Sequence, residues 1–247
     1  MHESYPYPPI IEAVIEVRVD GLIDEADRLK VGKKLSKFYP TERSQVNKTI
    51  NVDLDHDISS INPVGTVFTR ANGDEDEQIL LGPNSLSVSQ RATYPGWAKF
   101  FERFQRDWNA WKSVIGHRKV IQIGMRYINR IDVPLVDDVA RHEDYLTLQI
   151  QLPAAYPNTN GYSLMARLPL SEVHCFAVIN SGAVESPIPG HAGFLLDIDV
   201  IRQVDVPQND TDISDLLEEM RHAKNNVFQA LITDAARDRF RNDEHLR

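Results

Sequence analysis

Residues 120–133 read VIQIGMRYINRIDV, and this segment decides the fold class that the sequence predicts. Apolar side chains alternate along it from Ile121 to Ile131, with Tyr127 and Asn129 on the same face. A period of two is typical of a strand that buries one face. The segment comes shortly after Gly116, where a helical pattern ends. It therefore predicts that the order of strands and helices begins again at this point.

The segment before that strand is rich in aromatic side chains. Over residues 97–115 the apolar positions recur at helical spacing, which predicts an amphipathic helix with one buried stripe. The stripe comprises Trp97, Phe100, Phe101, Phe104, Trp108, Trp111, Val114 and Ile115. A groove for a ligand or partner is the alternative, but spacing this regular favours core.

The first half contains extended segments and one further helix. Residues 10–19 (IIEAVIEVRV) predict a first strand, and residues 24–38 predict an amphipathic helix. Three more extended segments are separated by Asn-Pro, Asn-Gly and Gly-Pro turns, which favours an antiparallel meander. They are residues 49–55, 64–71 and 79–90.

The second half repeats this order. After the strand at 120–133 we expect a short helix near 142–150, three strands, and one long helix from Asp212 toward Phe240. The three strands are residues 161–168, 173–180 and 193–201. The predicted fold is therefore α+β, with two pseudo-repeated lobes whose long helices pack on antiparallel sheets. The lobes are residues 1–116 and 117–247, together forming one compact body.

Composition and charge limit the partners of the chain. Its 247 residues carry a formal net charge of -9, which disfavours nucleic acid and anionic membranes. Cys175 is the only cysteine, so an intrachain disulfide and a cysteine-based zinc site are excluded. The first residues lack a signal-peptide pattern and no segment is apolar enough to span a bilayer, so we expect a cytoplasmic protein without a membrane partner.

Familiar signatures of enzymes and metal sites are missing from the sequence. There is no Gly-x-Ser-x-Gly elbow, no phosphate-binding loop with its lysine and no dinucleotide fingerprint. Residues 53–57 (DLDHD) resemble the start of a calcium loop, but the sixth position is Ile58 and the twelfth is Val64. His174 and Cys175 are adjacent strand residues and point to opposite faces. We therefore predict no catalytic residue, no metal and no cofactor.

Charged residues on two strands of the second half are the candidate ligand-binding set. Arg126 and Arg130 share one face of their strand, and Asp197 and Asp199 share one face of theirs. An ion-pair ladder between the two strands is the structural interpretation. In the functional one, the arginines hold an anionic ligand or acidic peptide in a cleft between lobes, and Asn129 and Asp199 fix its orientation.

Polar residues in the last helix are the candidate partner interface. His222, Asn225 and Asn226 interrupt its apolar stripe, which suggests a polar contact across an interface. A histidine that is satisfied within the packing is the alternative.

Three segments together carry a family resemblance. They are residues 7–16 (YPPIIEAVIE), residues 124–131 (GMRYINRI), and a C-terminal set of His222, Phe228 and residues 232–234 (ITD). With these the chain resembles a sporadically distributed bacterial family of proteins of this length and of unknown function. The resemblance implies almost nothing about chemistry. Its patchy distribution implies a laterally transferred gene, for instance in a phage-defence or toxin–antitoxin setting.

Three functions follow, in order of preference. The first is a non-catalytic binding or assembly protein that recognises a protein partner, alone or as a homo-oligomer, within such a complex. The second is a ligand sensor or enzyme with an anion-binding cleft between the lobes. The third is an RNA-binding or RNA-processing protein, which requires a continuous positive groove despite the acidic total.

Overall fold

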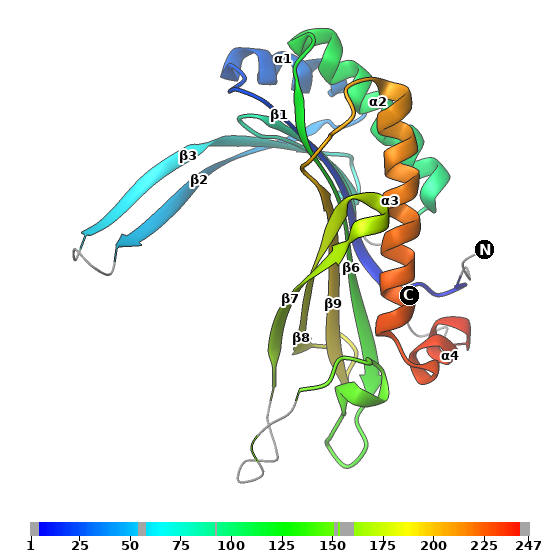
Figure 1. Cartoon of the computed structure of the whole chain (residues 1–247). Coiled ribbons are helices and arrows are strands. Elements are labelled where there is room, and N and C mark those ends of the chain that lie inside the picture. The colour runs from blue at the N-terminus through cyan, green and yellow to red at the C-terminus, as the bar shows by residue number, and fades with distance from the viewer. Residues whose placement is uncertain (1–4, 54–57, 92, 151–152, 154–160, 243–247) are drawn as a thin grey trace. The chain divides into compact units, whose positions relative to one another are not determined.

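The computed structural model describes residues 5–53, 58–91, 93–150, 153 and 161–242. Within them the chain has four α-helices and a large antiparallel sheet, which confirms the predicted α+β class (Figure 1). No helix of this described part is long and apolar enough to cross a membrane. Residues 54–57 of the calcium-loop-like segment lie outside the described residues.

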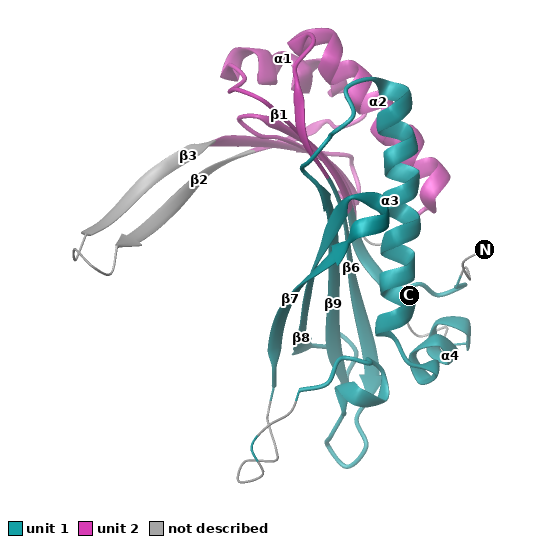
Figure 2. Cartoon of the chain, in the orientation of Figure 1, with its two compact units in different colours: residues 1–13, 124–247 teal, residues 14–123 magenta. Residues whose placement is uncertain are grey.

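The chain divides into two compact units (Figure 2). Unit 1 comprises Met1–Ala13 and Gly124–Arg247, and unit 2 comprises Val14–Ile123. The divisions fall inside strands β1 (Ile10–Val19) and β6 (Val120–Pro134), each of which contributes residues to both units. The lobe boundary that the sequence predicts after residue 116 stays a prediction.

Unit 2 contains two helices and a set of antiparallel strands. Its strand order is β2-β3-β4-β5-β1, and the pairs β2/β3, β3/β4 and β4/β5 are antiparallel. The elements after β1 are α1 (Glu25–Leu35), β2 (Thr41–Asp53), β3 (Ile58–Ala71), β4 (Glu77–Leu81), β5 (Ser85–Arg91) and α2 (Trp97–Ile115). The extended segment expected at 79–90 is thus a hairpin, which turns where the Gly82 N–H donates to the Ser85 carbonyl (2.9 Å).

The helices of unit 2 bury the faces that the sequence predicts. In α2 the side chains of Phe100, Phe104, Trp108 and Trp111 are buried, and this helix packs on β5 and on α1. Burial of large aromatic side chains is the main source of stability in such a layer. The stripe in this helix is therefore core and not a groove.

Unit 1 places two helices after its strands. Its strand order is β1-β6-β9-β8-β7, and the Arg130 N–H donates to the Pro9 carbonyl (2.9 Å) just before β1 begins. The pairs β7/β8 and β8/β9 are antiparallel. The elements after β6 are the 3-10 turn η1 (His142–Asp144), β7 (Ser163–Leu170), the 3-10 turn η2 (Ser171–Val173), β8 (Cys175–Glu185), β9 (His191–Arg202), α3 (Asp210–Leu231) and α4 (Asp234–Asn242).

One face of the unit 1 sheet is covered by α3. On β9 the side chains of Leu196, Ile198 and Val200 are fully buried on the helix side, where α3 packs. On β8 burial alternates, and the residues of opposite parity, from Phe176 to Gly182, are only half-buried. Alternation of this kind is typical of an antiparallel sheet with one face on the core. The other face of the sheet is therefore partly accessible.

Two helix predictions in the second half are wrong. The helix expected near 142–150 is a single 3-10 turn, because the backbone beyond it leaves the helical path to bond with the end of α3: the Thr147 N–H donates to the Leu231 carbonyl (3.0 Å). The long C-terminal helix is two helices, since the chain is extended at Ile232 (φ -110°, ψ 149°) and Leu146 forms a bridge with it. Tertiary pairing overrides helix propensity at both places.

The two halves have similar but unequal element orders. The first reads strand, helix, four strands and helix, and the second reads strand, 3-10 turn, three strands and two helices, with a further 3-10 turn between β7 and β8. The pseudo-repeat of the lobes stays a prediction.

Candidate functional site

The predicted ligand-binding residues lie on β6 and β9 of unit 1. Arg126 donates from Nε and Nη2 to the two carboxylate oxygens of Asp197, each at 2.8 Å. Asn180 Nδ2 donates to Asp197 Oδ2 (3.0 Å). This bidentate hydrogen bond raises the pKa of Arg126, with smaller contributions from the charges of Asp197, Asp199 and Glu12. Asp197 is 2% exposed, and the guanidinium of Arg126 neutralises its buried carboxylate.

The other predicted residues have separate partners. Arg130 Nε donates to Asp132 on its own strand (3.0 and 3.1 Å). Asn129 is buried on the helix side and donates to the Leu196 carbonyl (3.0 Å). The structure thus brings Arg126 and Asp197 together, with Asp199 contributing to the local field, and directs Asn129 away from them.

The predicted interface residues of α3 lie beside the buried stripe, not within it. His222 and Asn226 are exposed and Asn225 is half-buried. The buried residues of α3 are Ile213, Leu216, Leu217, Met220, Lys224, Val227 and Phe228. The polar residue that interrupts the stripe is therefore Lys224, which is not among the predicted site residues.

Lys224 is a buried cation in the packing of unit 1. Its side chain is 7% exposed, and its Nζ lies 3.8 Å from the centroid of the Tyr127 ring on β6. No carboxylate of the described residues forms an ion pair with it. Burial lowers the pKa of Lys224 to about 7, with a further contribution from the charge of Arg221. Lys224 lies at helical spacing from the apolar residues Met220 and Val227, and this spacing was the sequence signal that the lysine is buried.

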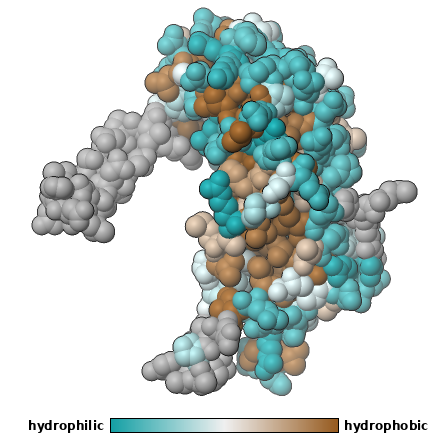
Figure 3. All heavy atoms as spheres, in the orientation of Figure 1, coloured by the Kyte–Doolittle hydropathy of each residue, from teal (hydrophilic) through white to brown (hydrophobic). Residues whose placement is uncertain are grey.

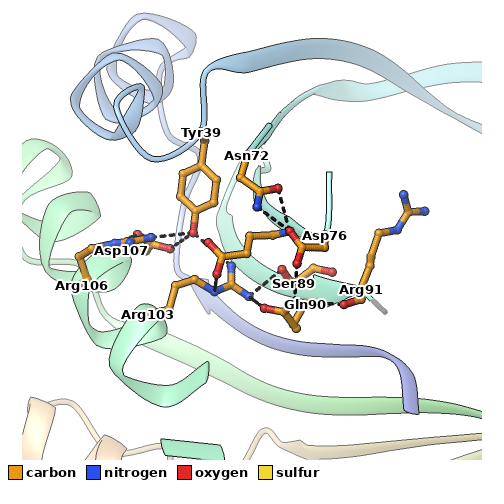
Figure 4. Close-up of polar contacts among 10 residues, drawn as sticks. Tyr39, Asn72, Asp76, Ser89, Gln90, Arg91, Arg103, Arg106 and Asp107 are labelled. Carbon is orange, nitrogen blue, oxygen red and sulfur yellow. Dashed lines mark hydrogen bonds and ion pairs between the residues drawn. The ribbon is translucent and has the colours of Figure 1, made fainter. Parts of the chain in front are cut away.

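A buried polar network joins the helices and strands of unit 2 (Figure 4). Tyr39, which follows α1, and Asp107 on α2 are both fully buried. The Tyr39 hydroxyl donates to Asp107 Oδ2 (2.5 Å) and accepts from Arg103 Nη1 (3.1 Å) and Arg106 Nη2 (2.8 Å). A phenol has one donor and two acceptor sites, so this hydroxyl is saturated.

The charges of this network balance each other. Arg106 Nε donates to Asp107 Oδ1 (2.8 Å), and Arg103 Nε lies 3.8 Å from Glu77 Oε1 on β4. Arg103 Nη2 also donates to the Ser89 carbonyl (2.8 Å). Burial raises the pKa of Asp107, opposed by its hydrogen bonds from Arg106 and Tyr39, and burial also raises the pKa of Tyr39. Two guanidinium groups face two carboxylates, so the charges of the network are paired with one another within the described residues.

A second layer of polar contacts supports the network from the end of β5 and from the β3–β4 turn. Gln90 Oε1 accepts from Arg103 (3.2 Å), and its amide donates to the Arg91 carbonyl (3.1 Å). The Asn72 side chain accepts from the Glu77 N–H (3.1 Å) and donates to Asp76. The whole set fixes α2 and the end of α1 onto β4 and β5, so we interpret it as structural.

Strand β7 forms one end of the strand order of unit 1. In its register with β8, Ser163 is opposite Gly182, and the residue before, Tyr162, accepts a hydrogen bond from the Ala183 N–H (3.2 Å). Hydrogen-bonded pairs in an antiparallel ladder recur at every second residue. The backbone groups of Leu164, Ala166 and Leu168 therefore point inward to β8.

The outer edge of β7 consequently carries the backbone groups of Ser163, Met165, Arg167 and Pro169. Pro169 has no N–H, and proline in a sheet is found where no ladder bond is needed, which agrees with this assignment. No described residue forms a hydrogen bond with this outer edge. It is an unpaired strand edge within the part of the chain that the structure describes.

The side chains beside this edge are exposed and mixed in character. Met165 is 78% exposed, and Arg167 is exposed with its guanidinium 3.6 Å from the centroid of the Phe176 ring on β8. Apolar side chains gather over the strands of unit 1 on the face that Figure 3 shows, next to the polar surface of α3. We call Ser163, Met165, Arg167 and Phe176 the β7 edge surface.

Metal and thiol chemistry find no support in the described residues. Among them no group of three or more His, Cys, Asp or Glu side chains is placed to hold a metal ion. Cys175 is buried, its thiol donates to the Val173 carbonyl (3.2 Å), and burial raises its pKa. A raised pKa disfavours the thiolate that a nucleophile needs.

Comparison with known proteins adds no family to this geometry: no protein-family model matches the chain, and no curated protein matches its sequence.

Proposed function

We propose that the chain is a non-catalytic protein-binding module, and that it binds its partner at the β7 edge surface. The observation that carries the proposal is the row of backbone groups at Ser163, Met165 and Arg167, which no other described residue pairs with. An unpaired edge offers N–H donors and carbonyl acceptors in the spacing that another strand needs. Binding at such an edge needs no catalytic group.

The side chains at this edge favour a protein partner. Exposed methionine and an arginine stacked on an aromatic ring are residue types enriched at protein interfaces. An edge strand that has no binding role is ordinarily protected by charges, by proline, by a bulge, by extreme shortness or by a covering helix or loop. The one proline of β7, Pro169, lies near the end of the strand and leaves the edge from Ser163 to Arg167 without this protection. Strand β7 has eight residues and one charged side chain, Arg167.

The predicted anion site on β6 and β9 is the weaker candidate. Asp197 already accepts hydrogen bonds from Arg126 at both carboxylate oxygens. An anionic ligand that displaced this carboxylate would leave a buried charge without its partner, at a cost of roughly 3–5 kcal/mol. The charge of -9 likewise disfavours the RNA-binding alternative. A role in a defence complex and a cytoplasmic location stay predictions.

Affinity capture from the native host with two matched variants tests the proposal. Met165→Pro removes an outward N–H and adds a ring that blocks strand addition, while the ladder to β8 is kept. Asn226→Ala changes an exposed position on α3. We expect the wild-type chain and Asn226→Ala to retain the same protein in constant proportion, and Met165→Pro to lose it. Capture that Met165→Pro leaves unchanged, or no capture by the wild-type chain, contradicts the proposal.

A further inference from the structure

The chemistry of the β7 edge surface also specifies the kind of segment that fits it, provided that the proposed protein-binding function holds. The outward backbone groups and the side chains of Met165 and Arg167 belong to the same residues. In the register with β8, Met165 is opposite Asn180 and Arg167 is opposite Val178, both on the half-buried face away from α3. A strand added to β7 would place its own alternate side chains directly beside Met165 and Arg167.

The positive charge of Arg167 has no carboxylate beside it among the described residues. Its guanidinium stacks on Phe176 at 3.6 Å, and no carboxylate of the described residues pairs with it. Stacking uses the face of the guanidinium and leaves the N–H groups in its plane available to an acceptor. A carboxylate on the neighbouring strand is the acceptor that suits this geometry best.

Met165, two residues before Arg167, suits an apolar neighbour instead of a charged one. It is 78% exposed, and its flexible thioether side chain adapts to apolar groups of different shapes. An apolar side chain on the added strand would cover it. Since Pro169 offers only a carbonyl to the outer edge, the surface suits a short segment of roughly five to seven residues.

We infer that the β7 edge surface binds an extended segment of a different protein as an added strand, with an acidic residue beside Arg167 and an apolar residue beside Met165. The acidic and the apolar residue are therefore two positions apart in the partner. If the acidic residue comes first, the added strand is antiparallel to β7, and if it comes second, the strand is parallel.

The β7 strand of a second copy of this chain does not meet these requirements. Strand β7 reads SLMARLPL and contains no acidic residue. Two β7 strands paired antiparallel about a twofold axis would place Arg167 beside another Arg167 or beside a neutral residue. Like charges directly opposite each other are destabilising, and a neutral neighbour leaves the guanidinium without a carboxylate. Charge complementarity therefore favours a foreign segment over the pairing of two β7 strands.

Selection from a displayed library of random ten-residue peptides on the full chain tests this inference. We expect the selected peptides to share an acidic residue two positions from an apolar one. Binding of a selected peptide should weaken about two- to fivefold in Arg167→Ala. Selection on Arg167→Glu should enrich Lys or Arg at the position of the acidic residue. Met165→Pro should abolish binding, and Asn226→Ala should leave it unchanged.

The outcomes separate this inference from the proposed function. Peptides that depend on Met165 but carry no acidic preference, and that bind Arg167→Glu equally well, overturn the inference and leave β7 as a protein-binding edge. A selection in which no peptide is lost in Met165→Pro overturns both. Circular dichroism and thermal unfolding of each variant establish that it is folded, so a loss of binding reports on the surface.

Discussion

The ammonium nitrogen of Lys224 lies 3.8 Å from the centre of the Tyr127 ring, within the packing of unit 1. The lysine is on α3 and the tyrosine is on β6, so the contact joins the helix to the sheet. A cation over an aromatic face is attracted by the ring, but the attraction is smaller than the cost of burying an unpaired charge. The burial of Lys224 therefore makes the stability of this unit sensitive to pH.

Lys224→Met should remove that sensitivity. Below the folded-state pKa of about 7 the lysine is protonated in the folded and the unfolded chain, and the folded state bears the full cost of desolvation. Between about 7 and the ordinary value of 10.5 the unfolded chain binds the additional proton, so this group makes the free energy of unfolding rise with pH. The slope has an upper limit of about 1.4 kcal/mol per pH unit.

Urea unfolding at several pH values from neutral to alkaline measures this effect. We expect Lys224→Met to be more stable than the wild-type chain at neutral pH, and the difference to shrink as the pH rises. Lys99→Met, at an exposed position of α2, is the control and should follow the wild-type profile. Parallel profiles for the wild-type chain and Lys224→Met would show that the lysine is not desolvated.

The Tyr39 network should be a structural support of unit 2. Tyr39→Phe deprives Asp107 of a donor, and Arg103 and Arg106 of an acceptor, so we expect a loss of about 1–3 kcal/mol in the free energy of unfolding. Tyr145→Phe is the matched control, since that tyrosine is half-buried and no hydrogen bond from its hydroxyl is found among the described residues. Equal stability of the two variants in denaturant unfolding contradicts a structural role.

The Arg126–Asp197 pair should behave as a structural ion pair. Arg126→Ala leaves the buried Asp197 carboxylate with Asn180 as its remaining side-chain donor, so we expect a loss of about 1–3 kcal/mol. The double variant Arg126→Met with Asp197→Leu should lose less, because no buried charge is left unpaired. Arg167→Ala is the control and should stay within about 0.5 kcal/mol of the wild-type chain. An Arg126→Ala variant of unchanged stability would return this residue to the ligand-binding candidates.

The exposed polar residues of α3 should contribute little to stability. We expect the double variant His222→Ala with Asn226→Ala to unfold within about 0.5 kcal/mol of the wild-type chain. Partner capture by this variant should equal that of the wild-type chain. Loss of the captured protein would instead support the interface that the sequence predicts on this helix, and it would move the binding surface away from β7.

Two proline substitutions in β7 should have opposite effects. The N–H of Met165 points outward, so Met165→Pro should leave thermal stability nearly unchanged. The N–H of Ala166 points to β8, so Ala166→Pro removes a ladder bond to Ile179 and should cost about 1–3 kcal/mol. If Met165→Pro is the more destabilising variant in thermal unfolding, the assignment of the outer edge is wrong.

Periodicity alone predicted most elements of the fold. The alternation over residues 120–133 and the aromatic stripe over 97–115 correspond to β6 and α2, because each element buries one face and the pattern records that burial. The break between α3 and α4 could not be predicted in this way. It depends on the pairing of Ile232 with Leu146, which is distant in the sequence and leaves no local signal.

The candidate site was less predictable from the sequence than the fold. The shared face of Arg126 and Arg130 was evident from their parity, but whether each has a carboxylate partner depends on strand register. The Tyr39 network combines Arg103, Arg106 and Asp107 of α2 with residues from β4, β5 and the chain after α1, so no spacing within one element marks the whole set. The β7 edge surface is defined by the end of a strand order, and neither hydropathy nor charge pattern reports which strand is last.

Residue-resolved amide hydrogen exchange of β7 tests the central claim most directly. In the free chain we expect the amides of Met165 and Arg167 to exchange much faster than those of Ala166 and Leu168, since only the latter two bond to β8. When a selected peptide saturates the chain, the amides of Met165 and Arg167 should become protected, and those of His222 and Asn226 should not change. Slow exchange of all four β7 amides in the free chain, or no added protection in the complex, would contradict the claim that β7 is an unpaired edge to which a partner strand is added.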